Sequence, residues 1–428
     1  MSATHDLLAF ARAPHMLPAG VRADAVRLLG DTLASGAAAV GAPGEPEILG
    51  AARLMGSGDE ARLIGTHERL PAPSAAFVNG YRVHCLEWDA VHEPAVVHAM
   101  SVVVAALHAA IDRQGGCDRE EALAALAVGV DIASGLGLSV DSPLTFFRPA
   151  TAGVIGAALA VARIIGAPAD NAMGLAYSSA AGTMQAHVEG SPTLPFQVAN
   201  AARGAIVAAD LAKAGFSAPK DVLEGPFGYY TLFEKGGLTR YTRDLGKVWR
   251  ISEISVKPYP SGRASHAALG TLADLELVAE EIERIELACP PLIHRLVGRP
   301  YHGAMTPAYA RLCLPWLSAL MITDKRIDPR RFVPADMAEP ALAALAAKFA
   351  LVADGNDDPN ALFPQELRVH FADGRVAAQA IAHTLGSPAN PLTGDKLAAK
   401  YALARELAPA SADPRIFHEP LGYFANGS

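Results

Sequence analysis

The chain has 428 residues, of which 51% are hydrophobic and 19% charged, and its formal net charge is −8. This composition excludes a disordered chain, because ample apolar surface is available for burial, and the length suggests about two domains. The acidic balance and the lack of a basic stripe argue against nucleic acid as a partner.

The cysteines and the apolar segments bear on the cellular location of the protein. The N-terminal sequence MSATHDLLAF has no basic region followed by a long apolar run, so we expect no signal peptide. The apolar stretch Ala150–Ala162 is shorter than the roughly 20 residues that cross a bilayer, which favours a core helix. Without a CxxC pair, the thiols fit a reducing cytoplasm and give no support for an iron–sulfur cluster. The four cysteines are Cys85, Cys117, Cys289 and Cys313.

From the N-terminus to about residue 255, apolar residues recur at helical spacing and are punctuated by Gly and Pro. Many of these apolar residues are small, which predicts close contacts between helices. This part of the chain is therefore predicted to be an all-helical domain. The expected helices include Ala23–Ala39, Met100–Arg113, Arg119–Leu138, Gly153–Gly166 and Ala199–Ala214.

The pattern changes after Trp249. Alternation of apolar and polar residues in EEIERIELACP predicts a strand, and Asp373-Gly374 between two alternating runs predicts a hairpin. The fold class expected is therefore mainly α, with an all-helical domain formed by residues 1–262 and 393–428 and an α+β lid formed by residues 263–392. The other elements expected are an extended Ile251–Pro258 and helices at Ala264–Glu280 and Pro307–Ile322.

A first cluster of polar residues lies in the sequence NGYRVHCLEWDAVHEPAVVH. Acids and imidazoles this close along the chain can tune one another's pKa and share a proton-transfer task. The same side chains are metal ligands, but no HExxH spacing is present and Pro94 interrupts a helical face, so we expect no metal. A purely structural role beside a helix is favoured for His84 and stays open for His98. The titratable members are His84, Glu87, Asp89, His92 and His98.

Two further segments could bind an anion. The turn VKPYPSGRASH leads into a predicted helix, and cations at the start of a helix favour an anion. Arg148 precedes Pro149 at the entry to another predicted helix, where a guanidinium suits a carboxylate. The alternatives are a solvated basic turn and a surface arginine paired with an acid. The residues of the turn that could act are Lys257, Tyr259, Arg263 and His266.

Taken in order, these segments resemble the MmgE/PrpD family, which includes 2-methylcitrate dehydratases, cis-aconitate decarboxylase and iminodisuccinate epimerase. The resemblance covers nearly the whole chain. It is carried by four segments, which are Asn79-Gly80 to Ser101, Ala208 to Gly225, Tyr259-Pro260-Ser261 with His266, and Asp373-Gly374 to Lys400 with its Gly386-Ser387-Pro388 and Asn390-Pro391-Leu392-Thr393.

The resemblance implies a helical domain, a smaller α+β lid with the active site between them, a homodimer and no cofactor. The chain also departs from the family pattern. Arg148 stands in a segment that usually carries His, and Leu194 and Gln197 stand where Lys and a following His are usual. The acidic D-D-T triple is reduced to Asp89-Ala90-Val91, its leading Asp is Glu87, and Gly262 replaces a Cys. These changes predict a different substrate or reaction.

The hypothesis drawn from the sequence is a lyase, dehydratase-like, acting on a small carboxylate. His98 and His266 would be the acid–base pair, oriented or tuned by Asp89 and Glu87, with His92 as a secondary candidate. An isomerase or epimerase, a decarboxylase, and a non-catalytic carboxylate-binding protein stay open. Loss of the usual Lys at the position of Leu194 favours the binding protein, and retention of both histidines argues against it. The substrate-binding residues would be Arg148, Lys257, Tyr259, Arg263 and Gln197.

Overall fold

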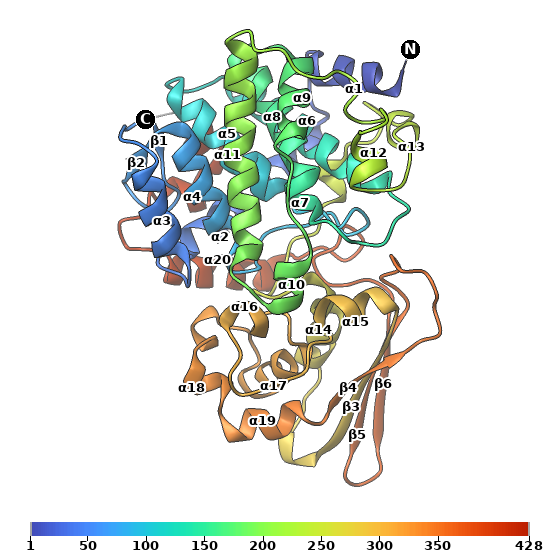
Figure 1. Ribbon diagram of the computed structural model, residues 1–428. Helices are drawn as coiled ribbons and strands as arrows, with labels where there is room; N and C mark the ends of the chain where they lie inside the picture. The colour runs from blue at the N-terminus through green and yellow to red at the C-terminus, as the bar shows by residue number, and fades with distance from the viewer. Residues whose placement is uncertain (1, 427–428) are drawn as a thin grey trace.

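The structure, a computed structural model, describes residues 2–426. It has two bodies, a large helical one and a smaller α+β one that lies against one end of it (Figure 1). The fold is therefore mainly α, with a large helical domain and a smaller α+β domain, as the sequence predicts. The last segment of the chain, after the sheet of the second body, returns to the helical body.

The helical body is built mainly from the first 253 residues. Four of the five predicted helices agree with the structure to within four residues at their ends, whereas the helix predicted at Ala199–Ala214 begins earlier, at Thr193. In chain order, the elements are α1 (Ala3–Arg12), α2 (Ala19–Ala38), α3 (Glu45–Leu54), β1 (Ala61–Arg62), β2 (Arg69–Leu70), α4 (Ala72–His84), α5 (Ala99–Arg113), α6 (Arg119–Leu138), α7 (Arg148–Thr151), α8 (Gly153–Ile165), α9 (Ala169–Ser178), α10 (Gln185–Glu189), α11 (Thr193–Lys213), α12 (Tyr229–Leu232), α13 (Thr239–Thr242) and the 3-10 helix η1 (Arg250–Glu253).

Small residues bring the central helices α4, α5, α6, α8 and α11 into close contact. At Gly156 on α8, an added Cβ would lie 2.3 Å from the carbonyl oxygen of Gly129 on α6, so only glycine allows the two backbones to meet there. By length and hydropathy, α6 and the continuous α7–α8 segment could each cross a membrane. However, 89% of each apolar window is buried inside the protein, so both are core helices of this fold.

The second body is a four-stranded sheet with helices packed on it, visible at the lower right of Figure 1. The strand order is β4-β3-β5-β6, in which β3 and β4 are parallel and the other pairs antiparallel. The hairpin predicted around Asp373-Gly374 joins β5 to β6. The strands are β3 (Ile282–Cys289), β4 (Phe349–Ala353), β5 (Gln365–Phe371) and β6 (Val376–Ile381).

Two predicted helices differ from the structure. The helix expected at Ala264–Glu280 is observed only as α14 (His266–Asp274), because the chain then becomes extended and packs Leu275 and Leu277 against the core on its way to β3. The helix expected at Pro307–Ile322 is split into α16 (Pro307–Ala310) and α17 (Leu314–Asp324). The break lies at residues 311–313, because Pro315 in the first turn of α17 has no N–H with which to continue the preceding helix and is well suited to starting a new one.

The remaining elements of the second body connect these parts, and the C-terminal helices pack on the helical body. Lys400 on α20 forms an ion pair with Asp31 on α2 at 2.5 Å, which ties the returning segment to the first domain. These elements are η2 (Arg263–Ser265), η3 (Ala279–Glu281), α15 (Pro291–Val297), η4 (Pro329–Arg331), α18 (Pro334–Met337), α19 (Pro340–Ala346), α20 (Gly394–Leu407), α21 (Arg415–His418) and α22 (Pro420–Ala425).

Candidate active site

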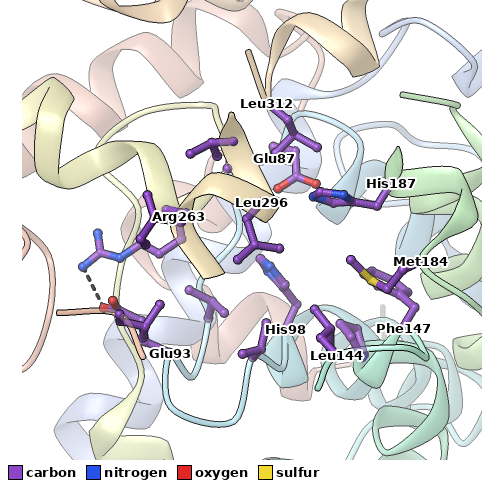
Figure 2. A pocket seen from close by; sticks show the side chains of 18 of the residues that line it. Glu87, Glu93, His98, Leu144, Phe147, Met184, His187, Arg263, Leu296 and Leu312 are labelled. Carbon is purple, nitrogen blue, oxygen red and sulfur yellow. Dashed lines mark hydrogen bonds and ion pairs between the residues drawn. The ribbon is translucent and has the colours of Figure 1, made fainter. Parts of the chain in front are cut away.

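A cavity lies where the two bodies meet, and it contains residues from the first polar cluster. It encloses about 820 Å³ of space, part of which is open to solvent. The helical body contributes His84, Glu87 and His98, and the second body contributes Arg263 and Gln365. Most of the remaining wall is apolar (Figure 2). A largely apolar cleft between domains with a few convergent polar groups is the usual form of a small-molecule site.

Local backbone geometry directs the acidic cluster towards this cavity. The helix α4 ends at His84, and Glu87 has a left-handed backbone with φ 54°, which turns the chain sharply. The chain then pairs Val91 with Ser255 of the segment before the second body and folds back before His98, the N-cap of α5. The C-terminus of α4, the N-terminus of α5 and the loop held by the Val91–Ser255 bridge therefore bring residues of the first cluster together.

Asp89 is the centre of this cluster and is fully buried. Its Oδ2 atom accepts hydrogen bonds from Nδ1 of His84 at 2.9 Å and Nδ1 of His98 at 3.0 Å, and from the hydroxyl of Ser101. Each ring therefore directs its Nε2 away from Asp89. Neither Nε2 atom makes a hydrogen bond within residues 2–426, and both rings line the cavity.

The environment of the two histidines shifts their pKa values in opposite directions. Burial alone would lower the pKa of His84, but the negative charges of Asp89 and Glu87 outweigh it and raise that pKa. For His98, burial lowers the pKa and is not fully offset by Asp89, with Lys257 adding to the lowering. Burial would raise the pKa of Asp89, but the two histidines hold it well below its usual value. Of the two rings that share this carboxylate, His84 therefore keeps its added proton to higher pH than His98, which is the electrostatic arrangement of an acid and a base.

Glu87 and Lys257 form a buried ion pair beside this cluster. The Nζ atom of Lys257 lies 3.0 Å from both Oε2 and the carbonyl oxygen of Glu87. The other carboxylate oxygen of Glu87 lies 3.5 Å from Nε2 of His84. Burial would raise the pKa of Glu87, but Lys257 and the two histidines lower it to about 2. Glu87 is therefore ionised, and Lys257, which we expected to hold a substrate carboxylate, is engaged by it instead.

His187 on α10 is a site residue that sequence reasoning missed. It lines the cavity, facing it together with His98 and Glu87 (Figure 2). Burial, together with the positive charge of Arg299, lowers its pKa to about 4, so it is neutral and able to exchange hydrogen bonds with a ligand. In the surrounding sequence, GTMQAHVEG, Glu189 is the one other titratable residue, so the sequence gives no sign of a site there.

The structure does not place His266 at the cavity, which corrects the expected pairing of His98 with His266. Its ring is fully buried, with Nε2 hydrogen-bonded to Ser261 and the ring face packed against Tyr259. Burial and the neighbouring Arg263 hold its pKa well below the usual value. It therefore supports the turn structurally. The partner of His98 in the structure is His84, for which the sequence favoured a structural role, and the two ring centroids are 4.8 Å apart.

Three other expected site residues also lie away from the cavity wall. His92 is buried, with Nε2 bonded to Glu253 at 3.0 Å, and so holds the loop rather than acting as a secondary acid or base. Gln197 binds the backbone of Thr183 through both ends of its amide. Tyr259 packs against the core beside His266, and burial raises its pKa to about 12. Each is committed to protein contacts.

The two expected arginines are both neutralised by protein carboxylates. Arg148 is buried, forms an ion pair with Glu234 at 2.8 Å, and donates to the carbonyl oxygens of Ala95 and Ser142. Its predicted role in binding a substrate carboxylate is therefore wrong, because its donors are used inside the helical body. Arg263 does line the cavity, but it forms an ion pair with Glu93 at 2.8 Å (Figure 2, dashed line).

A cation site is a further interpretation of the cluster. Within residues 2–426, His84, Asp89 and His98 are the one group whose potential ligand atoms all lie within 4.8 Å of one another. The Nδ1 atoms of both rings already form hydrogen bonds with a single carboxylate oxygen, which also accepts from Ser101. We interpret the group as a hydrogen-bonded triad for proton transfer.

Family profiles match both bodies of the protein. The profile described as the MmgE/PrpD N-terminal domain matches residues 10–241, and the MmgE/PrpD C-terminal domain matches residues 259–416. The first match alone covers more than half of the chain, and the second covers the sheet and its helices. The cavity is therefore lined by residues from both matched regions.

Individual relatives are similar over most of their length. The cis-aconitate decarboxylase-like protein oryM of Aspergillus oryzae is 26% identical, over 94% of this chain and 89% of its own. Human cis-aconitate decarboxylase is 26% identical, over 78% of this chain and 72% of its own. Cis-aconitate decarboxylase of Aspergillus terreus is 24% identical, over 82% and 78%.

Proposed function

The chain belongs to the MmgE/PrpD family, and from this premise we propose that it is a cofactor-independent lyase acting on a small organic acid. Membership of the family, and relatives named as decarboxylases, support a dehydratase- or decarboxylase-like enzyme. The finer assignment rests on one observation, which is the opposite pKa shift of two histidines that share Asp89 and face one cavity.

In the proposed dehydration, His98 is the general base and His84 the general acid. Neutral His98, with its proton on Nδ1 directed at Asp89, removes a proton from the carbon next to the substrate carboxylate. The C–H electron pair forms the new double bond as the C–O bond to the neighbouring hydroxyl breaks. Protonated His84 gives its Nε2 proton to the leaving oxygen, so water and an unsaturated acid are formed. Such positioned proton transfers typically contribute about 10²–10⁴-fold each.

A decarboxylation is the second candidate, favoured by the names of the relatives. In that reaction the bond to a carboxylate breaks, CO₂ leaves, and the electron pair remains on carbon. His84, as the imidazolium, would then protonate that carbon. Both reactions need the developing negative charge to be stabilised, and a buried imidazolium is well suited to this because few water molecules screen it.

Proton exchange in D₂O tests the assignment. We expect wild-type protein to incorporate deuterium next to the carboxylate of accepted acids or to form product, and His98→Gln and His84→Gln each to lose at least about 100-fold in rate. His266→Gln, with its thermal unfolding checked, should retain activity, because His266 does not line the cavity. Full activity in both site variants would overturn the proposal.

We also propose that the protein is a homodimer in the cytoplasm. Support for the dimer comes from exposed apolar side chains on α11, where Phe196, Val207 and Leu211 are each about 40% exposed. Light scattering on the purified protein should give twice the chain mass of 44.5 kDa. A monomer at micromolar concentration would contradict this part of the proposal. The four free cysteines fit a reducing compartment.

A further inference from the structure

A second cavity adjoins the first and shares part of its wall. It encloses about 1340 Å³ of space, including some open to solvent, between the ends of α4 and α11 and the short helix α16. His84, Glu87, Leu194 and Leu312 line both cavities. His84 therefore stands at the junction of the two spaces, with His98 beside it on the wall of the first, and a single ligand could occupy both.

Arg311 lines the second cavity without a carboxylate partner. The residue is only 3% exposed, and within residues 2–426 its guanidinium makes no ion pair within 4.0 Å and no hydrogen bond. Its one close partner is the ring of Phe332, with 4.6 Å between the guanidinium carbon and the ring centroid. Burying a charged group without compensating hydrogen bonds is costly, so an unpaired buried arginine facing a cavity indicates a place for an anion.

Three of the other cations near the site are neutralised by carboxylates. Arg263 is paired with Glu93, Lys257 with Glu87, and Arg148 with Glu234. Among residues 2–426, Arg311 is the one Lys or Arg lining either cavity that lacks a carboxylate partner. The acids on the second wall do not fill this role, since Glu87 is held by Lys257 and Glu47 is exposed. In the part of the chain that the structure describes, the walls of the two cavities thus offer one guanidinium that no protein carboxylate engages.

The first cavity is suited to a hydrocarbon group. Leu144, Phe147, Met184, Leu296 and Leu312 all line it, and Figure 2 shows their side chains directed towards its interior. Further apolar side chains complete the wall, including Val91, Val96, Leu194, Ile293, Val297, Leu362 and Phe363. A second or third carboxylate placed against this apolar wall would lose its hydration and gain no charged partner there, since Arg263 is held by Glu93 and the pKa of His187 is lowered to about 4; the cost is several kcal/mol for each ion.

We propose that the substrate is an acid with a single carboxylate and a hydrocarbon substituent, bound across both cavities. The carboxylate forms an ion pair with Arg311 in the second cavity, the carbon next to it lies at the His84–His98 junction, and the hydrocarbon part fills the first cavity. This inference rests on the proposed function and names its substrate class. It excludes citrate-like tricarboxylates as preferred substrates.

Equilibrium binding to matched probes tests the carboxylate subsite. The probes are trans-2-hexenoate, its neutral amide, which keeps the same chain, and cis-aconitate, which has three carboxylates. We expect wild-type protein to bind the hexenoate at least about tenfold more tightly than either other probe, because a charge-assisted hydrogen bond contributes roughly that factor or more. Equal binding of acid and amide, or tighter binding of cis-aconitate, would overturn the inference.

Variants of Arg311 separate the subsite from the catalytic proposal. Arg311→Met should raise the Kd of the hexenoate about 10- to 100-fold and leave the Kd of the amide unchanged, whereas Arg311→Lys should keep part of the preference. The matched control is Arg405→Met on α20, since Arg405 also packs on a ring, that of Phe417, but is exposed and far from both cavities.

Two further readouts guard against misfolding and against failure of the proposed function. Arg311→Met removes an unpaired buried charge, so its thermal midpoint should equal or exceed that of wild type, and hexenoate should raise the midpoint of wild type alone. If His98→Gln abolishes proton exchange while Arg311→Met binds hexenoate normally, the subsite is wrong and the lyase proposal survives. If Arg311→Met loses hexenoate binding but no acid undergoes exchange, the subsite stands and the lyase proposal fails.

Discussion

Replacing Asp89 by Asn tests the centre of the site in a way that changes charge with little change of shape. One oxygen of Asp89 accepts from His84 at 2.9 Å, from His98 at 3.0 Å and from Ser101. An Asn oxygen in the same place could keep these hydrogen bonds, but the negative charge would be lost. That charge is the largest of the influences that raise the pKa of His84 against the effect of its burial.

The expected loss of activity follows from this electrostatic change. Without the carboxylate, only Glu87 still opposes the effect of burial, so the pKa of His84 falls and the proposed acid loses its proton at lower pH. If the Asn side-chain nitrogen takes the place of the oxygen instead, Nδ1 of His98 must accept from it. The proton of His98 then lies on Nε2, which faces the cavity, and His98 can no longer act as a base. Either outcome removes one proton transfer, and a comparable change in serine-protease triads lowers kcat about 10⁴-fold. We expect a loss of about 10²–10⁴-fold here.

The assay is the rate of deuterium exchange or product formation between pH 5 and 9. In wild type, the alkaline limb of the profile reports loss of the His84 proton. In Asp89→Asn that limb should move to lower pH, because the charge that holds the proton is gone. The control is Asp131→Asn, a fully buried aspartate bonded to Tyr241 and distant from both cavities, which should leave the profile unchanged. Asp89→Asn with more than a tenth of wild-type activity and an unmoved limb would refute the reasoning.

Three further changes have expected outcomes. Lys257→Met removes a charge that lowers the pKa of His98, so the acid limb of kcat/KM should move to higher pH, and an unmoved limb would show that Lys257 does not act on the base. Burial lowers the pKa of His108 to about 4, so this ring is neutral in the folded protein and gains a proton when the protein unfolds in acid. The free energy of unfolding of His108→Leu, measured in urea, should therefore fall by roughly 3 kcal/mol less than that of wild type between pH 7 and 4. Parallel curves of this free energy against pH for the two proteins would contradict the expectation. Leu194→Lys introduces a cation where both cavities meet, so it should lower the Kd of cis-aconitate relative to trans-2-hexenoate in titrations, and an unchanged ratio would argue against a charge-determined preference.

Much of the fold follows from local sequence pattern. The Ala- and Gly-rich periodic segments predicted the central helices, and Asp373-Gly374 predicted the hairpin between β5 and β6. Prediction failed where a local rule was overlooked, as at Pro315, which splits the expected helix into α16 and α17. It also failed where tertiary packing decides, since Leu275 and Leu277 continue a helical composition yet are extended against the core.

The site was harder to predict, because spacing along the chain does not reveal which charges are already paired. The dense cluster of acids and imidazoles contains Asp89 and His98, which the structure joins by a hydrogen bond, and His98 lines the cavity. The basic turn VKPYPSGRASH does not provide unpaired cations. In the folded protein Arg263 forms an ion pair with Glu93 and Lys257 with Glu87, and these acids are about 170 residues away along the chain. Arg311 carries no local signal, because its importance comes from the partner that it lacks.

The central claim is that His84 and His98 hold different protonation states while sharing Asp89, and nitrogen NMR of histidine-labelled protein tests it most directly. Near pH 7, we predict that His84 carries protons on both nitrogens and that His98 carries one, on Nδ1. The titration of His84 should lie above that of a free histidine and the titration of His98 below it. Two rings that titrate together near pH 6.5, or in the reverse order, would contradict the account.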